Sequence, residues 1–230
     1  MEILLIHGAA NSAGVWRLWQ EELAGRGWPC QGVDLRGHGM APPMDLSHVS
    51  MEDYAADVEA TIAGLRDRPV LMGWSMGGLV AMIVAERGNA AGCICLAPSM
   101  PARSVDEAAP LREGVFGPEE YGILNSDPAD QPAMTDLNLE ERAIALQSLS
   151  WESRYARDQR ARGVVINFLS CPLLLITGEA DSQWPEERYR DLWLPAERVQ
   201  VPGASHWGLV LSRTAVTWTA PAVCSWLGKL

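Results

Sequence analysis

One short stretch constrains the fold of this chain more than any other, because it sets a glycine-flanked serine between a strand-like and a helix-like segment. Residues 69–88 open with the apolar run VLMGW, pass through the motif GWSMG at 73–77 and end in a segment with a broad apolar face. This order predicts a buried strand that turns directly into a helix. A serine at such a turn is held in a strained backbone conformation, with its hydroxyl clear of the sheet. A side chain at Gly73 or Gly77 would collide where strand and helix pass closely.

The rest of the chain alternates between short apolar runs and segments with helical spacing. Alternation of this kind predicts an α/β fold, with a parallel sheet covered by helices on both faces. Ser50 and Asp53 form a capping-box signal at the start of one of the helices. We expect six strands, at residues 2–7, 30–34, 70–74, 92–97, 172–177 and 198–201, and further helices at 15–23, 50–65, 186–192 and 213–227.

The alternation is interrupted between residues 98 and 170. This part is rich in Pro, Asp and Glu at first, becomes helical from about Leu139 and shows no buried strand. We therefore predict a core domain of residues 1–97 and 171–230, with residues 98–170 inserted as a cap. Parallel sheets bind ligands at the carboxyl ends of their strands, where we expect the insertion to lie.

Composition excludes several classes of partner. The net charge of −11 makes nucleic acid and anionic membrane surfaces poor partners. Five cysteines, an odd number without a CxxC pair, predict free thiols in a reducing compartment. No basic segment followed by an apolar one opens the chain, and no apolar run reaches about 18 residues, so we expect a cytoplasmic protein. No histidine pair has metal-ligand spacing, so we expect neither a metal nor a cofactor.

A serine hydroxyl is a poor nucleophile unless a base removes its proton, and histidine is the expected base. The chain has four histidines. His206 follows the last predicted strand, and in a parallel sheet this position shares an edge with Ser75. His7 and His38 lie in glycine-containing turns, where a structural role is expected, and His48 is expected to be exposed.

The histidine in turn needs a carboxylate that orients it. Asp181 follows the strand at 172–177 and is the expected partner, with Glu179 as the alternative. The chain order is then Ser, Asp, His, as in one known fold. A developing oxyanion needs two N–H donors, and we expect them from the backbones of Met76 and Ala9.

Five motifs together resemble the α/β-hydrolase fold family: HG at 7–8, DLRGHG at 34–39, GWSMGG at 73–78, GEAD at 178–181 and GASH at 203–206. The match spans the chain except for residues 98–170, which resemble that family's variable cap. The resemblance implies a three-layer fold with Ser75 as nucleophile, His206 as base, Asp181 as acid, and Ala9 and Met76 as oxyanion donors. The chain starts at what would be the family's third strand, so we expect a sheet without the N-terminal hairpin and with one exposed edge.

Two groups of residues bear on the substrate pocket. Trp207, Trp184 and Trp74 flank the three catalytic positions and Trp151 lies in the cap; they would wall a pocket for an apolar acyl or alcohol group, or only fill the core. Arg154, Arg157 and Arg160 recur at a spacing of three. They would attract a substrate carboxylate, or form a solvated face in which Arg154 pairs with Asp158.

These observations predict a serine hydrolase that cleaves a small carboxylic ester through an acyl-enzyme. The partner is then a small-molecule substrate, and the oligomeric state is left open. Lactone, thioester, amide or C–C bond hydrolysis and hydroxynitrile-lyase chemistry remain alternatives on the same triad. A small-molecule receptor on a hydrolase scaffold is the alternative from another class. Dehalogenation is disfavoured, because it would want an aspartate nucleophile.

Overall fold

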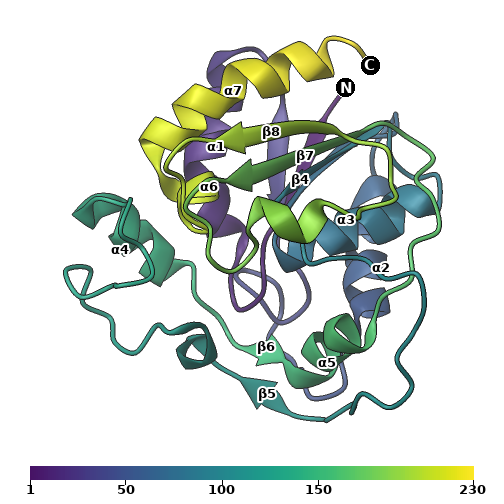
Figure 1. Cartoon of the computed structure of the whole chain (residues 1–230), viewed down its shortest axis with the longest axis vertical. Coiled ribbons are helices and arrows are strands. Elements are labelled where there is room, and N and C mark those ends of the chain that lie inside the picture. The colour runs from purple at the N-terminus through teal and green to yellow at the C-terminus, as the bar shows by residue number, and fades with distance from the viewer.

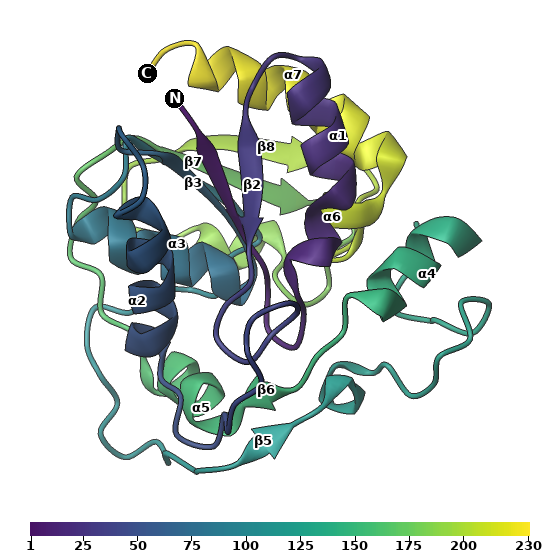
Figure 2. The same ribbon diagram turned by 180° about the vertical axis from the view of Figure 1, so that it is seen from behind.

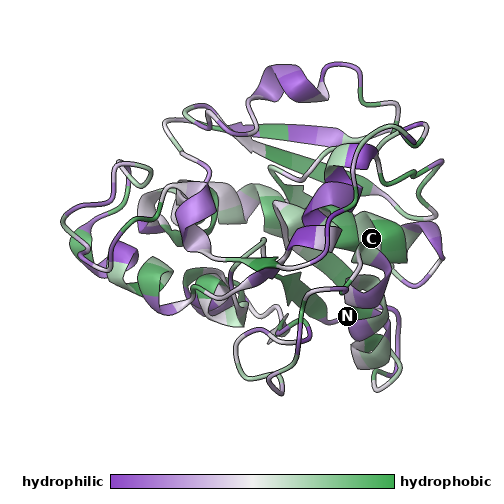
Figure 3. Ribbon diagram, turned by 90° about the horizontal axis from the view of Figure 1, so that it is seen from below, coloured by the Kyte–Doolittle hydropathy of each residue, from purple (hydrophilic) through white to green (hydrophobic).

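A six-stranded, entirely parallel sheet forms the centre of the protein in a computed structural model that describes residues 1–230. Its strand order is β2-β1-β3-β4-β7-β8, which confirms the predicted α/β architecture (Figure 1). Apolar residues (green) follow the central strands in Figure 3, as expected of strands buried on both faces. The strands are β1 (Ile3–Ile6), β2 (Cys30–Val33), β3 (Val70–Trp74), β4 (Gly92–Leu96), β7 (Leu173–Gly178) and β8 (Glu197–Val201).

Helices cover both faces of the sheet, which gives the three layers (Figures 1 and 2). One face packs against α1 (Arg17–Gly25), α6 (Gly208–Leu211) and α7 (Arg213–Leu227) around a cluster of 31 buried apolar residues. The other face packs against α2 (Met51–Ile62) and α3 (Met76–Glu86) around a cluster of 30. Because strands of one direction end at the same edge, the segments that follow β3, β7 and β8 meet there.

Two helix predictions were wrong in detail. The segment at 15–23 begins as a 3-10 turn, η1 (Ala13–Trp16), before α1 starts. The segment at 186–192 is only a 3-10 turn, η3 (Glu186–Tyr189). Tyr189 is its one buried residue, and a short charged segment with so little apolar contact gains too little from packing to extend.

The edge strand β2 is short and partly covered. It has four residues, and η1 packs beside it: a Cβ on Gly32 would lie 2.8 Å from the Cβ of Ala13. Ala13 is fixed there, because its N–H donates to the Asp34 carboxylate, which follows β2, at 2.6 Å. Because Cβ atoms point out of the sheet, η1 covers a face of β2, and the edge itself is only four residues long, which offers little surface for pairing with another chain.

Residues 98–170, the cap segment, cross the carboxyl edge of the sheet (Figures 1 and 2). They contain η2 (Pro118–Tyr121), α4 (Leu139–Gln147), α5 (Arg154–Arg162) and an antiparallel pair, β5 (Val115–Phe116) with β6 (Glu152–Ser153). Both residues of β6 are buried, so the expectation of no buried strand here was wrong. Glu152 and Ser153 are polar and are buried through hydrogen bonds, which leave no apolar run to recognise.

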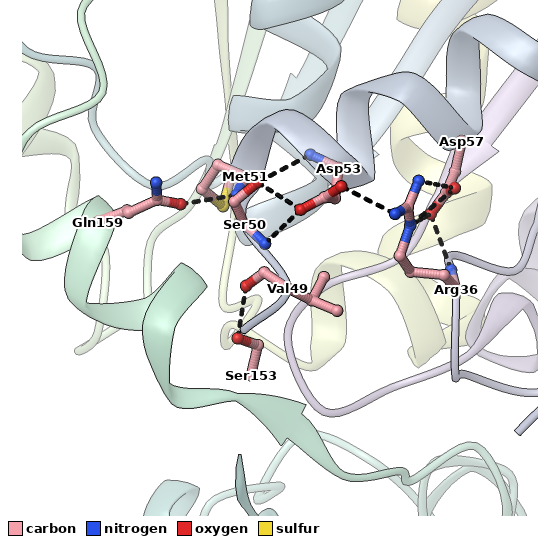
Figure 4. A network of polar contacts seen from close by, with 8 residues as sticks. All are labelled: Arg36, Val49, Ser50, Met51, Asp53, Asp57, Ser153 and Gln159. Carbon is pink, nitrogen blue, oxygen red and sulfur yellow. Dashed lines mark hydrogen bonds and ion pairs between the residues drawn. The ribbon is translucent and has the colours of Figure 1, made fainter. Parts of the chain in front are cut away.

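Side-chain hydrogen bonds join the cap segment to the start of α2 (Figure 4). Ser153 donates its hydroxyl to the Val49 carbonyl at 2.6 Å, and the Met51 N–H donates to Gln159 at 2.8 Å. The predicted capping box of Ser50 and Asp53 is formed at this point. In the same network, Arg36 binds the carboxylates of Asp53 and Asp57. The cap segment and the loop after β2 are therefore tied to the same end of α2.

No helix of the structure combines the length and the apolar character needed to cross a membrane.

The close approach of α3 to β1 yields the first prediction. A Cβ on Gly77 would lie well within 3.0 Å of the carbonyl oxygens of Ile6 and His7. These are backbone atoms at the end of a buried strand and cannot give way as a flexible side chain would. Gly77→Ala is expected to cost about 3 kcal/mol or more in the free energy of unfolding, measured by urea denaturation. Gly25→Ala, where a Cβ meets nothing within 4 Å, is the matched control, and equal effects of the two changes would contradict the prediction.

Candidate active site

Ser75 occupies a sharp turn between the last residue of β3 and the first residue of α3. Its backbone angles are φ 55° and ψ −119°, a conformation that non-glycine residues rarely adopt. The neighbouring strand holds it in place: the Ser75 N–H donates to the Leu96 carbonyl at 2.9 Å, and the Ser75 carbonyl accepts from the Ser99 N–H at 2.9 Å. The turn therefore presents the hydroxyl at the carboxyl edge of the sheet.

His206 and Asp181 lie together on the loops that follow β8 and β7. The Nδ1–H of His206 donates to the Asp181 carboxylate at 2.7 Å, and both side chains are buried. The other carboxylate oxygen accepts the N–H groups of Gln183 and Trp184 at 2.9 and 2.8 Å. Burial alone would raise the pKa of Asp181, but the hydrogen bond and charge of His206 and these N–H groups hold it below its usual value. The carboxylate is thus kept charged, and it fixes the Nδ1–H tautomer of His206.

Ser75 and His206 line the same cavity. No hydrogen bond joins the two side chains in this structure. Trp74 contacts His206 in two ways: its indole N–H donates to the His206 carbonyl at 3.1 Å, and the centroids of the two rings lie 5.0 Å apart. Asp136 of the cap segment accepts both the N–H and the hydroxyl of Ser205, the residue before His206.

The two backbone positions expected to donate to an oxyanion border this serine. Ala9 lines the cavity, and neither a carbonyl nor a side chain accepts its N–H. Met76 is the first residue of α3, so its N–H has no helical partner. Two hydrogen bonds hold the loop that carries Ala9. The Asn11 side-chain amide donates to the Ala9 carbonyl, and the Ala10 N–H donates to the Glu152 carboxylate.

This cavity, here called the narrow cavity, has a volume of about 20 Å³, far smaller than the second cavity described below. Loops of the core form one wall, and Pro118, Tyr121, Ile123 and Leu149 of the cap segment form the other. Trp207 lines it and packs on Trp74, with ring centroids 5.1 Å apart. A substrate group that enters this side of Ser75 must be small unless the cap segment moves.

A second cavity on the other side of Ser75, here called the cationic cavity, measures about 500 Å³. Trp184 lines it, as do Arg157, Arg160 and Arg188. Trp151, by contrast, is 59% exposed and borders neither cavity, so the structure does not bring it to the site. The buried residue at that point of the cap segment is its neighbour Glu152.

The arginine expectation needs a correction. Asp158 does not pair with Arg154 but with Arg112, at 2.8 Å, while Arg154 and Arg157 both bind Glu120. Arg160 is half-buried and its Nε is fully buried, so the three arginines do not form one solvated face. The partners Arg112 and Glu120 lie on two other segments of the chain, which a spacing along one helix cannot reveal.

The other histidines and Glu179 lie away from this chemistry. His7 is buried between the Gly8 carbonyl and the Leu35 N–H, and burial lowers its pKa to about 4. His38 is buried beside Glu152, and His48 is exposed. Glu179 accepts the Gly203 N–H and makes no contact with His206. No group of three or more His, Cys, Asp or Glu side chains is placed to hold a metal ion.

Sequence reasoning did not find several residues that shape the site. Tyr121 and Gln183 border both cavities, Arg188 borders the larger one, and Asp136 and Glu152 brace the loops of His206 and Ala9. None of them belongs to a local motif. Their roles come from contacts between segments far apart in the chain.

Comparison with known proteins identifies relatives of the sequence. Residues 3–218 match the model of the alpha/beta hydrolase family. A pimeloyl-[acyl-carrier protein] methyl ester esterase of Neisseria meningitidis serogroup A is 35% identical over 122 residues, which cover 51% of this chain and 35% of that protein. Its serogroup B counterpart is 33% identical over 133 residues, which cover 55% and 47%. The match thus spans less than half the length of these curated relatives.

Solved structures resemble the fold over almost the whole chain. Polyneuridine aldehyde esterase matches with a TM-score of 0.72 at 17% identity, covering 97% of this chain and 98% of the other. A thermophilic esterase from Thermogutta terrifontis matches with a TM-score of 0.70 at 22% identity, covering 100% and 90%. A methylesterase from Arabidopsis matches with 0.72 at 18%, covering 98% and 99%. With its parallel sheet and strained serine turn, and with the family model matched over residues 3–218, this chain belongs to the alpha/beta hydrolase family.

Proposed function

We propose that this protein is a serine hydrolase that cleaves a small carboxylic ester, with Ser75, His206 and Asp181 as its catalytic triad. One observation carries the proposal. The His206 imidazole is bonded to a buried carboxylate at 2.7 Å and lines the same cavity as a serine held at φ 55°. A nucleophile, a base and a group that orients the base are the parts that acyl transfer requires.

The reaction follows from these positions. The Ser75 oxygen attacks the ester carbonyl carbon, and His206 Nε2 accepts the hydroxyl proton while Asp181 stabilises the imidazolium. The negative charge that develops on the carbonyl oxygen is stabilised by the N–H groups of Ala9 and Met76. The C–O bond then breaks, and the alcohol leaves with the proton from His206. Water, deprotonated by His206, attacks the acyl-enzyme and releases the acid and free Ser75.

The narrow cavity favours a small leaving alcohol. His206 must give its proton to the leaving oxygen, so the alcohol side of the substrate lies on the side of Ser75 that His206 borders. That side is by far the smaller, about 20 Å³ against about 500 Å³ for the cationic cavity. The curated relatives are named as methyl ester esterases, and a methyl group is the smallest alcohol substituent an ester can carry.

An active-site probe and a substrate series test the proposal together. A fluorophosphonate should label the protein once, and peptide mass spectrometry should place the label on Ser75. Methyl esters should turn over repeatedly and faster than butyl esters of the same acid. A label on another residue would overturn the triad, and a single turnover per molecule would favour a receptor.

A further inference from the structure

The cationic cavity is the strongest feature that the proposed triad does not use. Three arginines line it, Arg157, Arg160 and Arg188, and no Asp or Glu does. The protein as a whole carries a net charge of −11, so a concentration of positive charge beside the nucleophile is opposite in sign to the rest. Cavity walls of one sign and low polarity focus the field on a ligand of opposite charge.

Two of the three guanidinium groups have no carboxylate partner. Arg157 binds Glu120, but no Asp or Glu oxygen lies within 4.0 Å of Arg160 or Arg188. The Nε of Arg160 is buried without a hydrogen-bond partner, and its terminal nitrogen reaches only the Tyr121 hydroxyl, at 3.5 Å. Arg188 stacks over the Trp184 ring at 5.1 Å, which orients it but leaves its donors free. A buried charged donor without an acceptor is costly, and a bound anion would remove that cost.

The two cavities meet at Ser75, and Tyr121 and Gln183 also border both. An ester whose carbonyl lies at Ser75 therefore extends one arm into each. His206 borders the narrow cavity only, so the alcohol side lies there and the acyl side extends into the cationic cavity. The acid that is released is thus the part of the substrate that contacts the arginines.

We infer that the acyl part of the substrate ends in an anionic group, a carboxylate or a phosphate-type group, held by Arg160 and Arg188 with Arg157. The substrate class is then the ester of a small alcohol with an acid that carries a second anionic group, such as a dicarboxylic acid monoester. This inference rests on the proposed esterase function. Guanidinium groups suit such anions because they bind them through paired, charge-assisted hydrogen bonds.

Matched substrates test the inference. Monomethyl glutarate and the methyl ester of glutaric acid monoamide have nearly the same shape, but only the first carries a charge at its far end. The wild-type protein should show a kcat/KM about ten- to a hundredfold higher for the charged ester at low salt, measured by titration of the released acid. Methyl 3-phosphonopropionate distinguishes a phosphate-type preference from a carboxylate one.

Arginine variants assign the preference to residues. In Arg160→Gln and Arg188→Gln the ratio between the two esters should fall about tenfold each, through a lower kcat/KM for the charged ester. Arg190→Gln is the matched control, because it lies two residues from Arg188 on the same turn and does not line the cationic cavity. Thermal unfolding confirms that each variant is folded.

The outcomes separate this inference from the proposed function. Ser75-dependent hydrolysis without a charge preference, or a preference unchanged by both substitutions, would overturn the inference and leave the esterase proposal standing. If no ester is hydrolysed through Ser75, the esterase proposal fails, and calorimetric titration of glutarate into wild type and Arg160→Gln tests the anion site by itself. Equal or absent binding in that titration would overturn it.

Discussion

Replacement of Ser75 by alanine should lower kcat for ester hydrolysis by about four orders of magnitude or more while the fold stays intact. The reason is that the acyl-enzyme of the proposed reaction forms on the Ser75 oxygen, which alanine lacks. The Ser75 side chain makes no hydrogen bond in this structure, so its removal leaves no buried group without a partner. Urea unfolding should therefore give nearly the same free energy for variant and wild type.

Ser99→Ala is the matched control for this change. Ser99 lies 24 positions further along the chain, borders the cationic cavity and has a buried hydroxyl, yet it has no place in the proposed reaction. Its loss should leave kcat for a neutral ester within about a factor of three, which is a change of less than 1 kcal/mol. If the two serine variants lost activity equally, the cavity rather than the nucleophile would be responsible.

Combined substitutions show whether the three residues act as a unit. His206→Gln should cost about as much as Ser75→Ala, and Asp181→Asn somewhat less, because the base keeps its place but loses its tautomer. The double variant of Ser75 and His206 should be no slower than either single variant, since a base without a nucleophile contributes nothing. Losses that multiply in the double variant would contradict a shared mechanism.

Much of the fold and the placement of these three residues could be predicted from sequence, because the signals are local. Each strand is an apolar run between turn residues, and the parallel direction brings all the loops after the strands to one edge. Gly77 was predicted to be required at a close approach, and the carbonyl of Ile6 stands where its Cβ would be. Ser75 follows β3 directly, and Asp181 and His206 come three and five positions after the ends of β7 and β8, so their common edge could be inferred from the strand order alone.

The cap segment could not be predicted in this way. Glu152 and Asp136 are charged residues in a polar stretch; Glu152 is fully buried, the rarer outcome for a carboxylate, and Asp136 is half-buried. Their partners lie more than 65 positions away: Asp136 meets Ser205 in the loop after β8, and Glu152 meets Tyr54 of α2. For Trp151 the prediction failed in the opposite direction: this cap residue was expected at the pocket, and its side chain is exposed to solvent instead. Only the packing of distant segments decides such positions.

Glu152 is the cap residue whose loss should matter most. Its carboxylate accepts the Tyr54 hydroxyl at 2.5 Å, the Ser153 N–H at 2.7 Å and the Ala10 N–H at 3.1 Å, and His38 Nε2 lies 3.7 Å away. Burial alone would raise its pKa, but His38, Arg160 and the Tyr54 hydroxyl lower it to about 2. One buried carboxylate thus joins the cap segment, α2, the loop after β2 and the loop of Ala9.

Glu152→Gln should lower the free energy of unfolding at pH 7 by about 3 kcal/mol, because three N–H or O–H donors then face one oxygen and an amide that is itself a donor. The pH dependence has a definite sign. A carboxylate with a lowered pKa stabilises the fold above its unfolded value near 4.5, and that stability is lost as the pH falls through 4.5 toward 2. The free energy of unfolding, measured with urea, should therefore fall more steeply between pH 5 and pH 2.5 for wild type than for the variant.

The kcat of Glu152→Gln shows whether Glu152 positions the loop of Ala9 or only stabilises the fold. If Glu152 fixes Ala10, and through it the Ala9 N–H, then Glu152→Gln should lower kcat about tenfold with little change in KM, at a temperature where the variant is fully folded. Tyr54→Phe removes one donor but leaves the charge and the Ala10 bond, so it should cost about 1 kcal/mol of stability and no kcat. Glu140→Gln, an exposed cap carboxylate without a hydrogen bond or ion pair, should change neither quantity. A Glu152 variant with reduced stability and undiminished kcat would show that the carboxylate supports the fold alone, since a mispositioned oxyanion donor must slow the chemical step even in the folded protein.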